Sequence, residues 1–157
     1  MIIYELSGSD KKRALARRVL EALPDWFGNP TAREEYIEES GSLLVFAAEE
    51  EGNPIGFLAL KRHYSTAAEI AVMGVLPEYH RKGAGRQLVQ KCLDYCLENK
   101  VEFLQVKTLD SSHPDPGYAK TRKFYYAMGF QPLECIPELW GKENPCLLLI
   151  QHIKTEK

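Results

Sequence analysis

The hydrophobic and polar positions of the chain follow two spacings, one typical of strands and one typical of helices. Short apolar runs bounded by turn residues predict seven strands. Apolar positions three and four residues apart predict four helices. We expect strands at about 2–6, 43–48, 55–60, 69–75, 103–108, 130–135 and 146–150, and helices at about 9–23, 31–39, 84–99 and 118–128.

Turn and capping residues mark several ends of these elements. Ser9 or Asp10 is suited to cap the first helix, because a short polar side chain can accept hydrogen bonds from its free N–H groups. Gly52 and Asn53 predict a hairpin turn between two strands. Gly129 is suited to end the last helix in a left-handed conformation.

The order of the elements indicates the α/β class. Two strand–helix–strand units in the middle of the chain imply some parallel pairing, and the hairpin signals imply antiparallel pairing. We expect a mixed, mostly antiparallel central sheet of six to seven strands, flanked by helices on both faces. The chain has 157 residues and shows no repeat or linker, so we expect a single domain over residues 1–157.

Composition and charge argue against several classes of protein. Hydrophobic residues make up 45% and charged residues 27%, as in soluble globular proteins, and no apolar run approaches the roughly 20 residues that span a bilayer. Lys and Arg number 20 and Asp and Glu number 22, which gives a net charge of -2. Such a balance does not favour general binding to nucleic acid or anionic lipid. We therefore expect a cytoplasmic protein with no nucleic-acid or membrane partner.

The four cysteines, Cys92, Cys96, Cys135 and Cys146, do not form a metal-binding motif. They contain no C-x-x-C pair, and no His or Asp set accompanies Cys92 and Cys96 to complete a site. We expect no metal and interpret all four as small core hydrophobes.

The segment from His80 to Gly85 lies between an expected strand and an expected helix. Backbone N–H groups at the start of a helix have no internal partner, and the helix dipole adds positive potential there. Glycines let an anion approach the backbone closely, and Arg81, Lys82 and Arg86 add positive charge. The segment therefore predicts an anion-binding turn.

Two nucleotide-binding motifs do not fit this turn. The P-loop requires Ser or Thr after its Lys, and Lys82 is followed by Gly83. The dinucleotide motif G-x-G-x-x-G requires a third glycine where this chain has Leu88. From these residues alone, the segment could also be a glycine-containing turn that leads into a helix and has no binding function.

Two motifs resemble those of the GNAT superfamily of N-acetyltransferases. After Val75-Leu76-Pro77, the residues Gly83-Ala84-Gly85 match the last part of the acyl-CoA-binding motif [QR]-x-x-G-x-[GA], with His80 in place of Gln or Arg. Downstream, F-Y-x-x-x-G-F at 124–130 matches the family pattern A-x-x-[FL]-Y-x-x-x-G-[FY], with Thr121 in place of Ala. The resemblance implies the GNAT-like acyl-CoA N-acyltransferase fold and acetyl-CoA as the acyl donor.

The resemblance also implies a set of cofactor contacts. In the family, the turn binds the pyrophosphate of coenzyme A through main-chain N–H groups, and the preceding strand pairs with the pantetheine arm. Carried over residue by residue, these contacts fall to Met73, Val75, Arg81, Lys82, Gly83, Ala84, Gly85 and Arg86.

Acetyl transfer from a thioester to an amine needs a base for the ammonium group and an acid for the departing thiolate. Glu69 is the candidate base, because it is a carboxylate on the strand leading to the turn, where family members carry a general-base Glu. It could act directly or through water, and the plainer interpretation is an exposed glutamate at the sheet edge. Tyr125 is the candidate acid, four residues before Gly129 as in the family; Tyr126 is a weaker choice, and packing is the plainer role for Tyr125.

Several other residues have a simple interpretation beside a functional one. His113, in the sequence S-S-H-P-D, is interpreted as a loop histidine, since no nucleophile elbow is present. Trp26 and Trp140 lie in loops that flank the acceptor groove in the family, where they could line it or pack. Glu34 or Glu38 could attract a cationic amine, although an acidic segment is usually a solvated surface.

The sequence thus predicts an acetyl-CoA-dependent N-acetyltransferase that acts on a primary amine of a small molecule or a lysine-like group. The expected mechanism is direct attack in a ternary complex, with Cys135 leaving a covalent route open. The alternative is a non-catalytic acyl-CoA-binding sensor or interaction module on the same fold. The identity of the acceptor is open. A homodimer is open as well, because an exposed edge strand can pair with a second copy.

Overall fold

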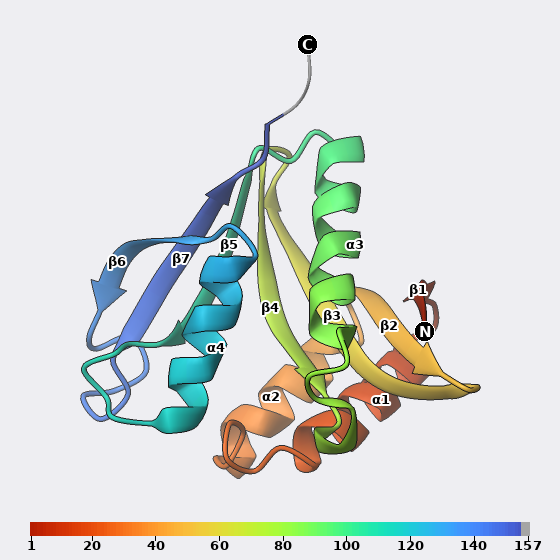
Figure 1. Cartoon of the computed structure of the whole chain (residues 1–157), viewed down its shortest axis with the longest axis horizontal. Coiled ribbons are helices and arrows are strands. Elements are labelled where there is room, and N and C mark those ends of the chain that lie inside the picture. The colour runs from red at the N-terminus through yellow and green to blue at the C-terminus, as the bar shows by residue number, and fades with distance from the viewer. Residues whose placement is uncertain (155–157) are drawn as a thin grey trace. The chain divides into compact units, whose positions relative to one another are not determined.

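The computed structural model describes residues 1–154, and within them every expected strand and helix is present in the expected order (Figure 1). A short 3₁₀ turn, η1 (Pro77–Tyr79), precedes the third helix. The strands are β1 (Ile2–Leu6), β2 (Leu44–Glu50), β3 (Asn53–Tyr64), β4 (Ala67–Val75), β5 (Phe103–Leu109), β6 (Gln131–Ile136) and β7 (Cys146–His152). The helices are α1 (Ser9–Glu21), α2 (Pro30–Ser40), α3 (Ala84–Glu98) and α4 (Pro116–Ala127).

The strands form a seven-stranded, mostly antiparallel open sheet in the order β1-β2-β3-β4-β5-β7-β6, which confirms the expected α/β class. β2 pairs in antiparallel fashion with β1 and with β3. The β2–β3 hairpin turns at Glu51 and Gly52, whose φ angles are 50° and 82°. Two positive φ angles are the mark of a tight hairpin turn, so the hairpin signal at Gly52 is confirmed.

Internal contacts group the chain into two compact units. The first contains residues 1–61 and 70–95, and the second contains residues 62–69 and the chain from Cys96 onward. The expected single domain over residues 1–157 stays a prediction, and residues 155–157 lie outside the described residues.

In the first unit, α3 crosses in front of the strands, and α1 and α2 lie behind them (Figure 1). The ring of Tyr95 on α3 meets the ring of Phe46 on β2, with the two centroids 6.0 Å apart. The buried residues of α3 lie three and four positions apart on one face of the helix: Ala84, Leu88, Val89, Cys92 and Cys96. The expected helix at this place therefore forms with this face against the core.

The start of α1 differs from the expectation. Its N-cap is Gly8, with a φ of 99°, and no side chain accepts a hydrogen bond there. Ser9 is the first helical residue, and Asp10 forms an ion pair with Arg13 at 2.7 Å instead of capping the helix. Gly8 adopts a backbone conformation that side chains disfavour, which lets the helix begin before either predicted cap.

The close approach of α1 to β4 depends on Gly74. A Cβ atom at this position would lie 2.9 Å from Cγ1 of Val19 and 3.0 Å from Cδ1 of Leu23. We expect Gly74→Ala to lower the free energy of unfolding by about 1–3 kcal/mol, because α1 has to shift to admit the methyl group. Urea unfolding followed by circular dichroism measures this loss.

The variant Val19→Ala serves as the control for Gly74→Ala, since it removes the nearer of the two atoms. In the double variant, we expect a combined loss smaller than the sum of the two single losses, because the residues share one space. Strict additivity of the two losses would contradict the close approach.

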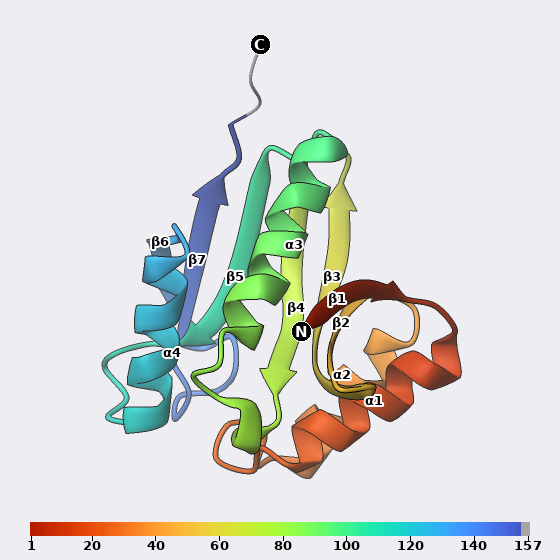
Figure 2. The same ribbon diagram turned by 45° about the vertical axis from the view of Figure 1, so that its right-hand side comes forward.

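In the second unit, β7 lies between β5 and β6 (Figure 2). β7 pairs in antiparallel fashion with both neighbours, so β5 and β6 run in the same direction without pairing. The parallel pairing that strand–helix–strand units imply is therefore absent between β5 and β6. The physical reason is burial: β7 contributes Cys146, Leu147 and Leu149 to the core, whereas β6 is almost wholly exposed and suits an edge.

The connecting helix α4 packs against β5 in the second unit. Its N-cap is Asp115, whose Oδ1 accepts a hydrogen bond from the N–H of Gly117 at 2.8 Å. The buried guanidinium of Arg122 donates to the carbonyl oxygen of Leu109 at 2.6 Å. Gly129 follows the helix with a φ of 101°, which confirms the predicted left-handed end.

The cysteines are core residues with one exception. Cys92, Cys96 and Cys146 are buried, and Cys135 on β6 is exposed. The prediction for Cys135 is wrong because an edge strand leaves both of its faces open to water. Within residues 1–154, no group of three or more His, Cys, Asp or Glu side chains could hold a metal ion. No helix in the same range is long and apolar enough to cross a bilayer.

Candidate functional site

The turn between β4 and α3 is tied to the end of the strand by His80. Nε2 of His80 donates a hydrogen bond to the carbonyl oxygen of Val75 at 2.7 Å. The imidazole also meets the ring of Trp26 edge-on, with the centroids 6.0 Å apart. The N–H of His80 bonds to the carbonyl oxygen of Pro77 at 3.2 Å. His80, which replaces the Gln or Arg of the motif, therefore holds the turn in place.

The backbone of the turn is left-handed at Arg81 and Gly83, where φ is 65° and 86°. Glycine adopts this conformation freely, whereas an arginine pays about 1–2 kcal/mol for it. The first hydrogen bond of the helix runs from the N–H of Gln87 to the carbonyl oxygen of Gly83 at 3.0 Å. Among residues 1–154, no backbone carbonyl accepts a hydrogen bond from the N–H groups of residues 81–86. Such a run of free N–H groups forms a concavity suited to an anion.

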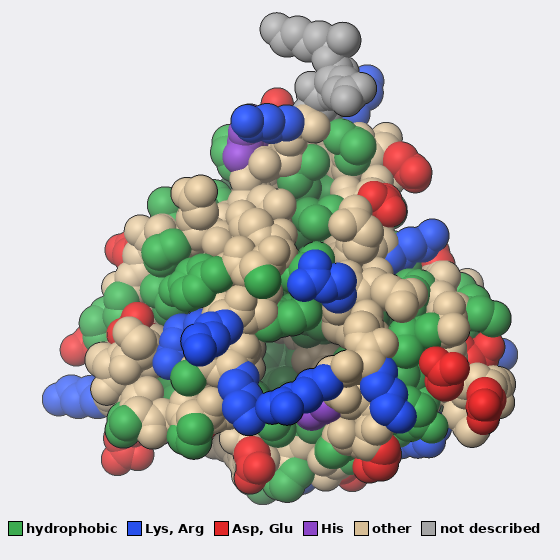
Figure 3. Space-filling view, in the orientation of Figure 1, with side chains coloured by type: hydrophobic (Ala, Val, Ile, Leu, Met, Phe, Trp, Pro, Cys, Tyr) green, Lys and Arg blue, Asp and Glu red, His purple; other side chains and the backbone are tan. Residues whose placement is uncertain are grey.

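Three cations surround these N–H groups. The side chains of Arg81, Lys82 and Arg86 are exposed, and Lys and Arg side chains gather over the start of α3 (Figure 3). Nζ of Lys82 lies 5.4 Å from the centroid of the Tyr79 ring, within range of a cation–π contact. Mobile cations beside free N–H groups fit the pyrophosphate that the sequence predicts for this turn.

β4 carries the other predicted cofactor residues. Side chains along this strand alternate between half-buried and buried, as in a strand with one open face. Glu69, Ala71 and Met73 share the half-buried side. Val75 is buried, because its side chain lies against Gly56 of β3.

Glu69 lies in a hydrogen-bonded cluster within the second unit. Its Oε1 lies 2.7 Å from Nε2 of His63, and its Oε2 accepts a hydrogen bond from Nζ of Lys107 at 2.8 Å. Nζ of Lys107 also lies 3.4 Å from Oε1 of Gln105. The Glu69 side chain is 12% exposed. The plainer interpretation of Glu69 as a glutamate in open water at the sheet edge is therefore wrong.

His63 and Lys107 were not among the residues that the sequence indicates as candidates. The third strand was expected to end near Leu60, whereas β3 continues to Tyr64 and brings His63 back beside Glu69. Beyond Leu60 the residues Lys61, Arg62 and His63 show no alternation of apolar and polar positions, so no local pattern indicates the longer strand. Lys107 lies 38 positions from Glu69 in the chain, and no local pattern indicates their pairing.

Tyr125 is packed within the second unit, and its side chain is 6% exposed. Its ring meets those of Phe124 and Phe130, with centroids 5.5 and 5.6 Å away. Burial and, to a smaller extent, the neighbouring Tyr118 raise the pKa of Tyr125 well above its ordinary value. The hydroxyl therefore stays protonated at neutral pH, which is the state that a general acid requires.

Neither thiol near this region is poised as a nucleophile. Burial raises the pKa of Cys146 to about 11, although the positive charge of Lys107 acts in the opposite direction. Partial loss of hydration raises the pKa of Cys135, and the charges of Asp110 and Glu134 add to the effect. Because the thiolate is the reactive form, these shifts disfavour the covalent route through Cys135.

The acidic residues considered as amine attractors already have cationic partners. The guanidinium of Arg17 donates a hydrogen bond to the carboxylate of Glu34. This hydrogen bond is the main reason why the pKa of Glu34 is lowered. Glu38 lies 3.8 Å from the guanidinium of Arg13. These pairs fit the simpler interpretation of a solvated surface.

The remaining candidates lie in loops. The backbone N–H of His113 bonds to the carbonyl oxygen of Asp110 at 3.1 Å, within the turn before α4. Trp140 is 38% exposed in the loop between β6 and β7. His113 is thus a loop histidine, as interpreted from the sequence.

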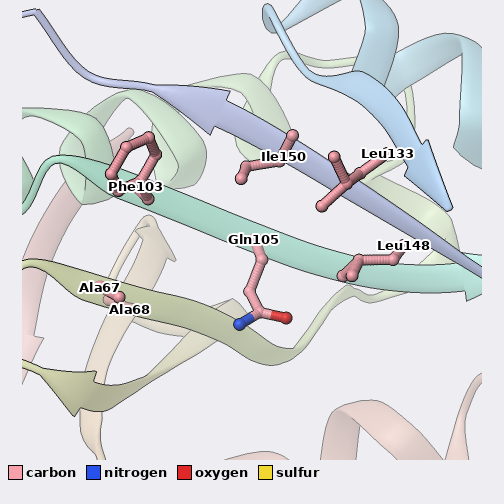
Figure 4. A pocket seen from close by; sticks show the side chains of 7 residues that line it. All are labelled: Ala67, Ala68, Phe103, Gln105, Leu133, Leu148 and Ile150. Atoms are coloured by element: carbon pink, nitrogen blue, oxygen red, sulfur yellow. The ribbon is translucent and has the colours of Figure 1, made fainter.

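An apolar recess lies on the open face of β5 and β7 (Figure 4). Gln105 is its polar member, and the same side chain contacts Lys107 of the Glu69 cluster. The recess therefore borders that cluster. Its lining residues are Ala67, Ala68, Phe103, Gln105, Leu133, Leu148 and Ile150.

Comparison with known sequences gives a family and a relative. A family model described as the acetyltransferase (GNAT) family matches residues 11–130. An uncharacterized N-acetyltransferase of Chlorobaculum tepidum is 35% identical over 82 residues, which are 52% of this chain and 53% of that protein. The match thus spans about half the length of the relative.

Solved structures share the fold over nearly the whole chain. The ribosomal-protein-S18-alanine N-acetyltransferase from Escherichia coli superposes with a TM-score of 0.76 at 18% identity, covering 99% of this chain and 96% of that one. An aminoglycoside 6'-N-acetyltransferase complexed with coenzyme A gives a TM-score of 0.74 at 18% identity, covering 100% and 99%. At these identities the likeness establishes the fold.

Proposed function

Because the chain belongs to the GNAT family of acetyltransferases, we propose that it transfers the acetyl group of acetyl-CoA to a primary amine. The acceptor is a small molecule or a lysine-like group, and the amine attacks directly in a ternary complex. The observation that carries the proposal is the turn at 80–86, with its free N–H groups and its three exposed cations. Such a turn is suited to the pyrophosphate of coenzyme A.

The cofactor contacts are proposed for the residues predicted from the sequence. The N–H groups from Arg81 to Arg86 would hold the pyrophosphate, and the backbone of Met73 and Val75 would pair with the pantetheine arm. Acetyl-CoA supplies an acyl carbon already activated as a thioester. The chain has to bind it, exclude water and move two protons.

Two side chains are proposed for the proton transfers. Glu69 supplies the base function that removes a proton from the ammonium group, either itself or through an intervening group. Tyr125 is the acid that protonates the departing thiolate, because its phenol hydroxyl is protonated at neutral pH and can donate its proton. A direct route without a cysteine intermediate is supported by the raised pKa values of Cys135 and Cys146.

The test is thiol release from acetyl-CoA in the presence of a panel of amines. The panel contains an aminoglycoside, a polyamine, an aromatic amine, a peptide with a free N-terminus and a lysine peptide. We expect release with at least one class, in equal amounts with acetylated product. Tight acetyl-CoA binding without release across the panel would favour the alternative, a non-catalytic acyl-CoA sensor.

The turn itself gives a prediction about cofactor affinity. We expect Gly83→Val to raise the KM for acetyl-CoA at least about 10-fold, because valine disfavours a φ of 86° and crowds the anion's approach. Initial rates at varied acetyl-CoA measure the change.

The matched control is Gly52→Val, at a hairpin glycine whose φ is 82° and whose Cβ would meet nothing within 4 Å. This variant imposes similar backbone strain away from the turn, so its KM should stay at the wild-type value. Equal increases in both variants would contradict a specific role of the turn.

A further inference from the structure

Glu69 and His63 form a hydrogen-bonded pair in which the carboxylate is the inner member. Oε1 of Glu69 lies 2.7 Å from Nε2 of His63, and Lys107 occupies the other oxygen at 2.8 Å. The exposed fraction of the side chain is 12% for Glu69 and 32% for His63. The imidazole is therefore the member of the pair that faces solvent.

The hydrogen bond determines which nitrogen of His63 carries the proton. An ionised carboxylate only accepts hydrogen bonds, so Nε2 must donate and Nδ1 keeps its lone pair. Within residues 1–154, Nδ1 of His63 has no hydrogen-bond partner. A carboxylate behind an imidazole fixes the tautomer and stabilises the imidazolium that forms on protonation.

We propose that His63 receives the proton of the acceptor amine, and that Glu69 is a positioning residue that orients the imidazole and stabilises its charged form. This inference rests on the proposed function. Nδ1 of His63 takes one proton from the ammonium group, and the free amine then attacks the thioester carbon. A C–N bond forms, the C–S bond breaks, and a second proton from the nitrogen ends on the thiolate by way of Tyr125. The imidazolium later releases its proton to water.

The other charged groups around the pair are compatible with this role. Lys107 on β5 faces Glu69 and balances its charge, and Cys146 on β7 is a neutral thiol at pH 7 because its pKa is about 11. Arg62, next to His63 on β3, donates to the backbone carbonyls of Tyr64 and Ser65. The charges of Lys107 and Glu69 cancel, and the imidazole of His63 is the group of the cluster that can accept one proton.

The kinetic test compares His63→Gln with His152→Gln. His152 is an exposed histidine on β7 that contacts Phe103, with ring centroids 5.3 Å apart, and it lies outside the cluster. For an accepted amine, we expect His63→Gln to lower kcat/KM about 100-fold at pH 7 and to remove the acidic limb of the pH profile. The KM for acetyl-CoA should stay unchanged, and His152→Gln should behave like the wild type. A wild-type rate and pH profile in His63→Gln would overturn the proposal.

A second measurement does not depend on activity. Long-range ¹H–¹⁵N NMR of the labelled chain should show His63 as the Nε2–H tautomer. In Glu69→Gln we expect the Nδ1–H tautomer to appear beside it, because an amide can donate as well as accept a hydrogen bond and no longer fixes which nitrogen carries the proton. The signal of His152 should not move.

The two measurements separate this inference from the proposed function. If no amine is acetylated but the tautomers of His63 become mixed in Glu69→Gln, the proposed function fails while the His63–Glu69 pairing stands. A purely Nε2–H tautomer in Glu69→Gln, or an Nδ1–H tautomer in the wild type, would overturn the role of Glu69 as the positioning residue.

Discussion

Glu69→Gln is expected to lower kcat by about 100-fold or more at pH 7, because it removes the carboxylate on which proton abstraction depends. The amide keeps the size and shape of the side chain, so the loss reflects charge and basicity. The loss of activity relative to the wild type should be largest at low pH. It should become smaller as pH rises, since a greater fraction of the amine is then deprotonated in solution. Rates of thiol release across the pH range measure this effect.

Glu134→Gln is the matched control for Glu69→Gln. Glu134 is an exposed glutamate on β6 of the same unit, and the substitution removes one negative charge from a strand in the same way. Its rate should equal that of the wild type. A rate for Glu69→Gln that matches this control at pH 6 would contradict any role for Glu69 in catalysis. Thermal unfolding of both variants identifies any loss that is due to instability.

Tyr125→Phe should lower kcat by about 10- to 100-fold while leaving the KM for acetyl-CoA within about twofold. The variant keeps the ring that packs between Phe124 and Phe130 and removes only the hydroxyl. Because burial raises the pKa of Tyr125, the wild-type hydroxyl stays protonated well above neutral pH. The wild-type profile should therefore show no loss from Tyr125 ionisation up to about pH 10.

Tyr126→Phe is the control, since Tyr126 is the adjacent residue and is 43% exposed. It removes the same group from the next position of α4 and should leave kcat unchanged. If the two variants lose activity equally, the acid is not Tyr125. A loss confined to Tyr126→Phe would assign the role to the residue that the sequence ranked second.

Much of the fold is predictable because its signals are local. The apolar stripe of α3 and the alternation along β4 depend on side chains two to four residues apart, and both appear in the structure. The glycine turn before α3 also follows from neighbouring residues. The cap of α1 is a local signal that gave a wrong prediction, because Gly8 occupies the N-cap position in place of Ser9 or Asp10.

The parts that could not be predicted involve residues far apart in the chain. The insertion of β7 between β5 and β6 depends on which strand has more apolar surface to bury, and this is decided by competition between whole strands. The exposure of Cys135 follows from that choice, since β6 becomes the edge. The link from His80 to Val75 spans five residues, yet it depends on the path of the turn rather than on a repeat.

The sequence by itself determined the class of fold, the anion-binding turn and the identity of Glu69 and Tyr125 as candidates, because each rests on a short motif or a fixed spacing. Only the tertiary structure decided what surrounds Glu69. His63 meets it because β3 extends beyond its predicted end, and Lys107 meets it across 38 residues because β4 and β5 belong to the same sheet. A local motif is enough to identify a candidate side chain. The residues that contact it are brought together by strand pairing, which depends on burial across the whole chain.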